Sequence, residues 1–153
     1  IAILTILAGC IGALAYFDVK KIIIYNIIIA VGVILFGISQ MNAAGVEGSI
    51  FYLVHDMLIK AALFLLVGIL TVIFGTSNLR KMGGLIKSYP LFGWTFLIAA
   101  FGLAGIPPLS GFPGKLLIVQ GGFEGTHFWG SLVILATSLL VLLSVVRIFI
   151  YAF

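Results

Sequence analysis

Residues 50–75 read IFYLVHDMLIKAALFLLVGILTVIFG, an apolar run interrupted near its middle by Asp56 and Lys60. A helix rises about 1.5 Å per residue, so a helix of this length spans the ~30 Å of hydrocarbon in a bilayer. The rest of the chain has the same character, because 63% of its 153 residues are hydrophobic and only 8% are charged. This composition excludes an ordinary soluble domain and predicts an all-α, polytopic transmembrane helix bundle.

Short polar stretches divide the chain into further apolar segments. We expect helices over residues 1–17, 22–39, 50–75 and 89–105, followed by a broken helix over 112–152. Residues 40–49 are assigned to a loop because of their asparagine, glycines and glutamate. Residues 1–153 are treated as a single transmembrane domain. Since the sequence starts and stops within apolar runs, we expect it to be a fragment of a longer subunit.

Residues 106–114, IPPLSGFPG, cannot continue a regular helix. Proline removes a hydrogen-bond donor and disfavours helical conformation in the residue before it. At membrane depth, irregular backbone is tolerated only where it is buried in protein or faces a water-filled cavity. The sequence therefore predicts a discontinuous helix. A second interruption is expected at 121–125, because residues 112–147 exceed what one straight crossing needs.

The cations fall mainly between the apolar runs, a pattern typical of membrane topology rather than of nucleic-acid binding. Two polar stretches, 18–21 and 76–88, hold five of the eight lysines and arginines: Lys20, Lys21, Arg80, Lys81 and Lys87. Two predicted helices separate these stretches, so both are expected on the same side of the membrane, which the positive-inside rule makes the cytoplasmic side. The last predicted crossing is expected to bring the chain back, so that Arg147 also lies on that side.

Lys60 is exceptional because it is predicted to lie at membrane depth, where a charged side chain costs about 2.5–3.5 kcal/mol and usually belongs to an ion or proton path. Asp56 and Lys60 are four residues apart and share a helix face, while His55 points to the neighbouring sector. Such a cluster can exchange protons on small rearrangements. We predict that Lys60, Asp56 and His55 belong to a proton path. The alternative is a static Asp56–Lys60 ion pair that fixes helix packing.

Lys115 directly follows the proline- and glycine-rich break, which makes it a second candidate for a proton path. The alternative is a lysine that extends to the lipid headgroups. Four polar side chains are candidates to line the path or simply to pack helices: Asn26, Gln120, Ser138 and Ser144. The sequence contains no nucleotide-binding loop, nucleophile triad or metal-ligand spacing, so no cofactor or metal is expected.

Three stretches, in this order and spacing, resemble a known family. They read DVKKIIIY at 18–25, HDMLIKAALF at 55–64 and LAGIPPLSGFPGK at 103–115. In these stretches the chain is similar to the antiporter-like membrane subunits shared by Mrp-type sodium/proton antiporters and respiratory complex I. Residues 76–85 are most similar to the D-type subunits of the Mrp group.

The resemblance implies a subunit built from two inverted five-helix repeats, of which this fragment covers much of the second. It implies that Lys60 lies in a central hydrophilic axis and that Lys115 lies on a discontinuous helix near the end of the proton path. Many relatives carry a histidine four residues before the first of these lysines. Here that position is Asp56, and His55 comes one residue earlier.

The function implied by the resemblance is proton translocation within a multisubunit Na⁺/H⁺ antiporter of the bacterial cell membrane. Such a subunit is a secondary transporter rather than an enzyme, and its partners are other membrane subunits, the lipid bilayer, protons and Na⁺, with no nucleic acid. Two alternatives remain open: a proton-pumping subunit of an NADH:quinone oxidoreductase, and a structural membrane scaffold whose lysines are inert.

Overall fold

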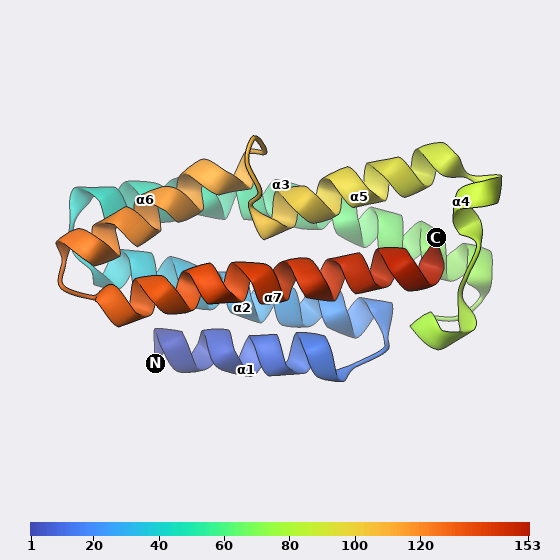
Figure 1. The fold of residues 1–153 in the computed structure, drawn as a ribbon, viewed down its shortest axis with the longest axis horizontal. Coiled ribbons are helices and arrows are strands. Elements are labelled where there is room, and N and C mark those ends of the chain that lie inside the picture. Colours follow the sequence, from blue (N-terminus) through green and yellow to red (C-terminus); the bar gives the residue numbers. More distant parts are fainter.

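The computed structural model describes residues 1–153 and is entirely helical. Long helices lie side by side along one direction, and the chain reverses between them (Figure 1). In chain order the elements are α1 (Ala2–Ala15), α2 (Val19–Ser39), α3 (Ala43–Phe74), the 3₁₀ turn η1 (Leu79–Lys81), α4 (Leu85–Ser88), α5 (Pro90–Ala104), α6 (Gly111–Glu124) and α7 (Phe128–Ala152). The predicted all-α architecture is confirmed.

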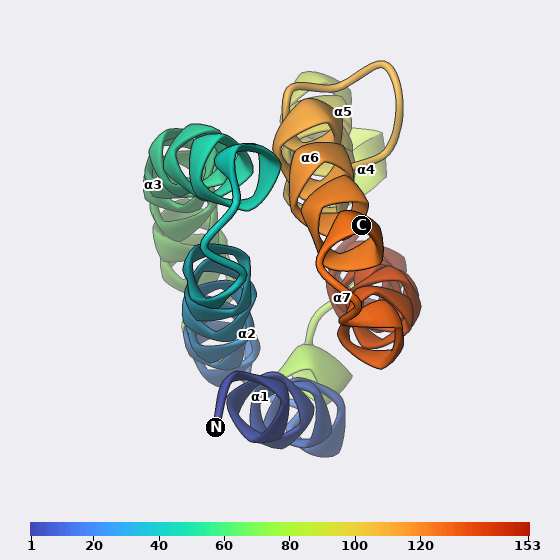
Figure 2. The same ribbon diagram turned by 90° about the vertical axis from the view of Figure 1, so that its left-hand side faces the viewer.

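Seen end-on, α1, α2 and α3 form one side of the bundle and α5, α6 and α7 form the other (Figure 2). The two sides meet where α3 packs on α6 and where α1 packs on α7. Buried apolar side chains from all the long helices form one continuous core. Three helices, α2, α3 and α7, are long and apolar enough to cross a membrane, whereas α1 and α5 are shorter apolar helices.

Helix α3 begins earlier than predicted. Residues 43–49 were expected in a loop, but α3 starts at Ala43, where the side chain of Asn42 caps it by accepting a hydrogen bond from the Gly45 amide at 2.8 Å. The glycines that suggested a loop serve close packing instead. A Cβ on Gly48 would lie 2.8 Å from the backbone nitrogen of Ile118, so only glycine lets α3 approach α6 this closely.

The predicted broken helix over 112–152 is wrong. Residues 111–124 and 128–152 form two helices, α6 and α7, which run in opposite directions after a reversal at residues 125–127 (Figure 1). The expected interruption at 121–125 is therefore the end of α6 and the start of this reversal. The chain breaks without reversing at residues 105–110 instead, and α5 and α6 follow one another alongside α3 (Figure 1).

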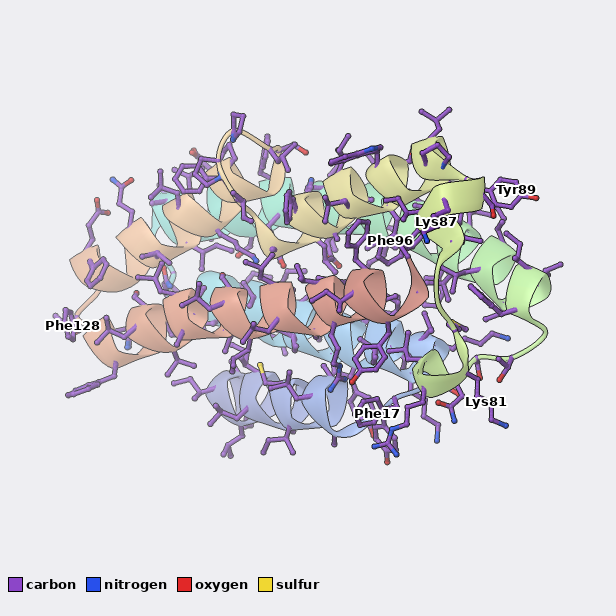
Figure 3. The ribbon with its side chains drawn as sticks, turned by 45° about the vertical axis from the view of Figure 1, so that its right-hand side comes forward. Phe17, Lys81, Lys87, Tyr89, Phe96 and Phe128 are labelled. Atoms are coloured by element: carbon purple, nitrogen blue, oxygen red, sulfur yellow. The ribbon has the colours of Figure 1, made fainter.

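The two basic stretches lie side by side at one end of the bundle, as predicted. The Val19 amide donates to the Ser77 carbonyl at 3.0 Å, and the Leu79 amide donates to the Phe17 carbonyl at 2.8 Å. Figure 3 shows Phe17, Lys81 and Lys87 at this end and Phe128 at the opposite end. All basic loop residues therefore gather on one side, as the positive-inside rule requires.

Asp18 caps the first turn of α2, so this helix starts at Val19 rather than at residue 22. Its carboxylate accepts hydrogen bonds from the amides of Lys20 and Lys21 at 2.9 and 3.2 Å and from the Ser77 hydroxyl at 2.6 Å. Burial raises the pKa of Asp18, but these hydrogen bonds outweigh it and hold the pKa below its ordinary value. Asp18 thus joins the two basic stretches.

Arg147 also belongs to the basic end. Its guanidinium donates to the carbonyl oxygens of Leu14, Ala13 and Tyr16 at 2.7, 3.0 and 2.6 Å. These acceptors are at the carboxyl end of α1, where helix carbonyls lack partners within their own helix. A cation at this position is also favoured by the helix dipole. Arg147 therefore fastens α1 to α7.

Candidate functional site

The site is built around the carboxyl end of α5. The helix stops at Gly105, which has φ +79°, a conformation that glycine adopts without strain. The Phe101 carbonyl accepts from the amides of Gly105 and Ile106, and the Gly102 carbonyl also accepts from the Gly105 amide. The carbonyls of Gly102, Leu103 and Ala104 accept hydrogen bonds from side chains of other helices. The broken helix thus presents a cluster of acceptors to its neighbours.

Lys115 on α6 occupies part of this cluster. Its ammonium donates to the Ala104 carbonyl at 2.7 Å, and Leu103 offers a longer contact at 3.4 Å. The ring of Tyr52 lies 5.6 Å from the Nζ atom, within cation–π range. Lys115 is only 7% exposed and has no carboxylate within ion-pair distance. Its charge is compensated by helix-end carbonyls and an aromatic face, and the side chain points inward rather than to the lipid headgroups.

Lys60 is compensated differently. Its ammonium lies 2.6 Å from Oδ2 of Asp56, and this is the chain's only ion pair. Both residues are buried on the inner face of α3, as the spacing predicts. The second carboxylate oxygen, Oδ1, is buried without a hydrogen-bond partner. The pair is therefore formed but leaves one acceptor free.

His55 lies five residues before Lys60 on α3 and bridges the break. Its Nε2 atom is 3.1 Å from the Gly102 carbonyl on α5, and its Nδ1 atom is 2.9 Å from the hydroxyl of Ser110, directly before α6. Reasoning from sequence did not select Ser110 or Gly102. Ser110 could have been selected because it is the only residue with a hydroxyl group in the break at 106–114. Nothing in the sequence distinguishes Gly102 from the other glycines.

The path-lining candidates separate into three groups. Asn26 on α2 donates to the Ser144 hydroxyl on α7 at 3.1 Å, so these two buried residues form one pair across the bundle. Ser138 lines a cavity of about 250 Å³ with Lys115, between the break and α7. Gln120 is exposed and donates to Glu124 at 3.0 Å, so the structure does not bring it to the lysines.

No group of three or more histidine, cysteine or acidic side chains is placed to hold a metal ion. What the site offers instead is a set of titratable side chains near the break between α5 and α6. His55 and Asp56–Lys60 come from α3, and Lys115 comes from α6. Such interruptions place backbone carbonyls at membrane depth, where they can stabilise a cation.

A family model described as the transmembrane region of NADH:quinone oxidoreductases and Mrp antiporters matches residues 1–141. The chain belongs to this family. It is 60% identical, over all 153 residues, to the D-type subunit of the Na⁺/H⁺ antiporter of Bacillus subtilis, of which it covers 31%. It is 43% identical over 152 residues to a putative antiporter subunit, mnhD2, of Staphylococcus aureus and covers 30% of that protein.

Two solved assemblies contain chains with the same fold. One is the Mrp complex from Dietzia sp., with a TM-score of 0.94 and 34% identity over 99% of this chain and 29% of the other. The second is respiratory complex I from Thermus thermophilus with bound NADH, with a TM-score of 0.93 and 28% identity over 99% of this chain and 32% of the other. The chain thus spans about a third of its relatives' length. The predicted family and multi-pass membrane character are confirmed.

Proposed function

We propose that this segment belongs to the proton-translocating subunit of a multisubunit Na⁺/H⁺ antiporter, a secondary transporter of the bacterial cell membrane. Support comes from the 60% sequence identity to the D-type antiporter subunit of Bacillus subtilis and from the structural similarity to a chain of the Dietzia Mrp complex. Other membrane subunits, protons and Na⁺ are its proposed partners.

The observation that carries this proposal is the position of Lys115 at the end of α5. Its ammonium donates to main-chain carbonyls instead of a carboxylate. A lysine held in this way can lose its proton without leaving a buried carboxylate unpaired, which would be costly. The carbonyl dipoles stay in place and stabilise the ammonium when it forms again. Lys115 is therefore suited to accept and release protons repeatedly.

Lys60 is proposed as the intermediate carrier and Lys115 as the terminal one. The Asp56–Lys60 pair is neutral as a whole, so a proton can shift within it at a smaller electrostatic cost than at an isolated buried charge. His55 lies on α3 and contacts the Gly102 carbonyl of α5, in the same final turn as the carbonyls that Lys115 contacts. Hydrogen bonds and water in the 250 Å³ cavity would connect Lys115 onward past Ser138.

The arrangement of helices supports the same proposal. We infer that α5 and α6 together make one discontinuous crossing, because they follow one another alongside the 32-residue helix α3 (Figure 1). Helices α1, α2, α3, α5–α6 and α7 then give five crossings. This number matches a five-helix repeat, which agrees with the chain spanning about a third of its relatives.

The test is Na⁺/H⁺ exchange in vesicles that contain the complete subunit in its complex. Lys115→Ala is expected to abolish exchange without preventing assembly, whereas Lys81→Ala, at an exposed loop position, is expected to leave it unchanged. Normal exchange in the Lys115→Ala complex would refute the proposed role of this lysine.

The similarity to a complex I chain favours one second candidate, a subunit whose proton movement is driven by electron transfer. Vesicles without any electron donor separate the two functions. Exchange under these conditions supports the antiporter, and exchange that appears only with a donor supports the alternative.

A further inference from the structure

His55 makes hydrogen bonds to both halves of the interrupted helix at once. The Gly102 carbonyl belongs to the last turn of α5, and Ser110 precedes the first turn of α6. The imidazole comes from a third helix, α3, and is 7% exposed. One side chain therefore closes the gap between two helix ends that the chain itself joins only through residues 105–110.

These contacts define the protonation pattern of the ring. A carbonyl oxygen can only accept, so the Nε2 atom must carry a hydrogen and donate it to Gly102. In the neutral ring, Nδ1 is then an acceptor, and the Ser110 hydroxyl donates to it. If His55 takes up a proton, Nδ1 becomes a donor and the Ser110 oxygen accepts. Both hydrogen bonds persist in either state, and only the second one changes direction.

Gly111 makes this arrangement possible. A Cβ at this position would lie 2.5 Å from the Gly102 oxygen and 2.7 Å from Nε2 of His55. Any side chain here would push apart the helix end and the imidazole. The close approach is thus built into the sequence at the first residue of α6.

The two ring nitrogens face different surroundings. Nε2 points at the end of α5, whereas Nδ1 meets Ser110, which is exposed and borders a groove of about 510 Å³ along the outer face of α3. Glu47 lies on the same groove. The other titratable groups near His55 are Tyr52, Asp56 and Lys60 on its own helix and Lys115 on α6, and α5 contributes only the Gly102 carbonyl.

We propose that His55 and Ser110 form a proton-exchanging clasp across the break, in which the Ser110 hydroxyl relays protons to and from His55 for the transport function proposed above, on which this inference rests. The Ser110 hydroxyl passes its proton to Nδ1 while its oxygen takes one from a hydronium ion in the groove, which becomes water. The reverse transfer returns the proton to water. No bond across the break is lost in either direction, so the carbonyls that hold Lys115 keep their place. His55 and Lys115 donate to neighbouring carbonyls of one turn, so a proton on one disfavours a proton on the other.

The first test measures the pH profile of exchange in vesicles carrying the intact complex. Ser110→Ala should lower the rate about tenfold near its optimum, the scale of one lost hydrogen bond, and shift the profile. Ser110→Thr, which keeps the hydroxyl, should restore the wild-type rate and the wild-type pH profile. Thr95→Ala removes an exposed hydroxyl of α5 that bonds its own helix, and should change neither. A Ser110→Ala profile with the wild-type shape would overturn the proposal.

The second test reports the clasp without transport. In ¹⁵N-histidine spectra of the intact complex, the signal lost in His55→Gln identifies His55, and neutral His55 is expected as the Nε2–H tautomer with a hydrogen-bonded Nδ1. Ser110→Ala should move the Nδ1 signal, and Thr95→Ala should not. An Nδ1–H tautomer would contradict the clasp. If Ser110→Ala abolishes exchange at every pH, no pH profile can be measured, and the position of the Nδ1 signal then tests the clasp. Failure of the Lys115 proposal appears as normal exchange in Lys115→Ala, which leaves the His55 tautomer unaffected.

Discussion

The Nζ atom of Lys115 lies 2.7 Å from the carbonyl oxygen of Ala104, so a buried ammonium completes the hydrogen bonding of a helix that ends inside the bundle. The end of α5 at Gly105 supplies the carbonyl acceptor for the Lys115 ammonium, and Lys115 supplies a donor for that carbonyl. Lys60, four residues after Asp56, satisfies its charge within a single helix. The two lysines are therefore expected to respond differently to substitution.

Lys115→Arg should abolish exchange while the complex still assembles. The guanidinium keeps a positive charge and can donate to the α5 carbonyls, but it does not lose its proton in proteins. Exchange in vesicles and the yield of purified complex are the two measurements. Retained exchange would show that the charge at this position matters and its proton does not.

Asp56→Asn should destabilise the protein by about 3–5 kcal/mol, because it leaves the Lys60 ammonium buried without its counter-ion. The double variant Asp56→Asn with Lys60→Met should recover most of this stability, since no unpaired charge remains. Thermal unfolding of the purified complex gives the stability. Exchange should stay lost in the double variant, whereas intact exchange would favour an inert structural pair.

Gly111→Ala should lower the melting temperature and reduce exchange, because its Cβ would meet the Gly102 oxygen and the His55 ring. Gly68→Ala is the matched control. A Cβ on Gly68 meets nothing within 4 Å, and alanine in a helix interior is more stable than glycine by about 0.5–1 kcal/mol. Equal effects of the two substitutions would show that the break tolerates a side chain at residue 111.

Asp18→Ala should cost about 1 kcal/mol, the usual contribution of a helix N-cap, at neutral pH. The pKa of Asp18 is lowered in the fold, so the contribution of its carboxylate is present above the ordinary value of 3.8 and is lost as pH falls through the lowered pKa. The stability difference between wild type and Asp18→Ala should therefore shrink in strong acid. A difference independent of pH would exclude the charge as its source.

Arg147→Leu should loosen α1 at the basic end, because three carbonyls lose their donor. Cys10, buried on α1, reports this change through its labelling by a maleimide. Labelling should become faster in Arg147→Leu and stay slow in Lys87→Leu, which removes an exposed cation of α4. An unchanged labelling rate would show that α1 is held by its apolar contacts alone.

Reading the sequence predicted those features that depend on local chemistry. Apolar runs predicted the helices, and proline and glycine predicted the break at 106–114. The four-residue spacing predicted that Asp56 and Lys60 share a helix face. The errors arose where helix packing decides the outcome. Gly45 and Gly48 resemble a loop in sequence, but both lie in α3. The small size of Gly48 permits its close contact with α6, and that of Gly45 permits a close approach to Gly37 of α2.

The candidate site was only partly predictable for a related reason. His55 and Ser110 are 55 residues apart, and Asn26 and Ser144 are 118 apart, so neither pair leaves a periodic signal in the sequence. The reversal at 125–127 was also missed, because α6 and α7 are both apolar and their order in space depends on α3. Long-range hydrogen bonds of this kind become visible only when the helices are in place.

The glycine contact between α3 and α6 also determines which parts of the molecule can move. At Gly48 the backbones of the two helices touch, and Gly114 packs in the same way on Tyr52. No layer of side chains separates the two helices at these points, so we expect α6 and the amino-terminal half of α3 to move together. In the proposed transport, we therefore expect Lys115 on α6 to keep its position relative to His55 on α3.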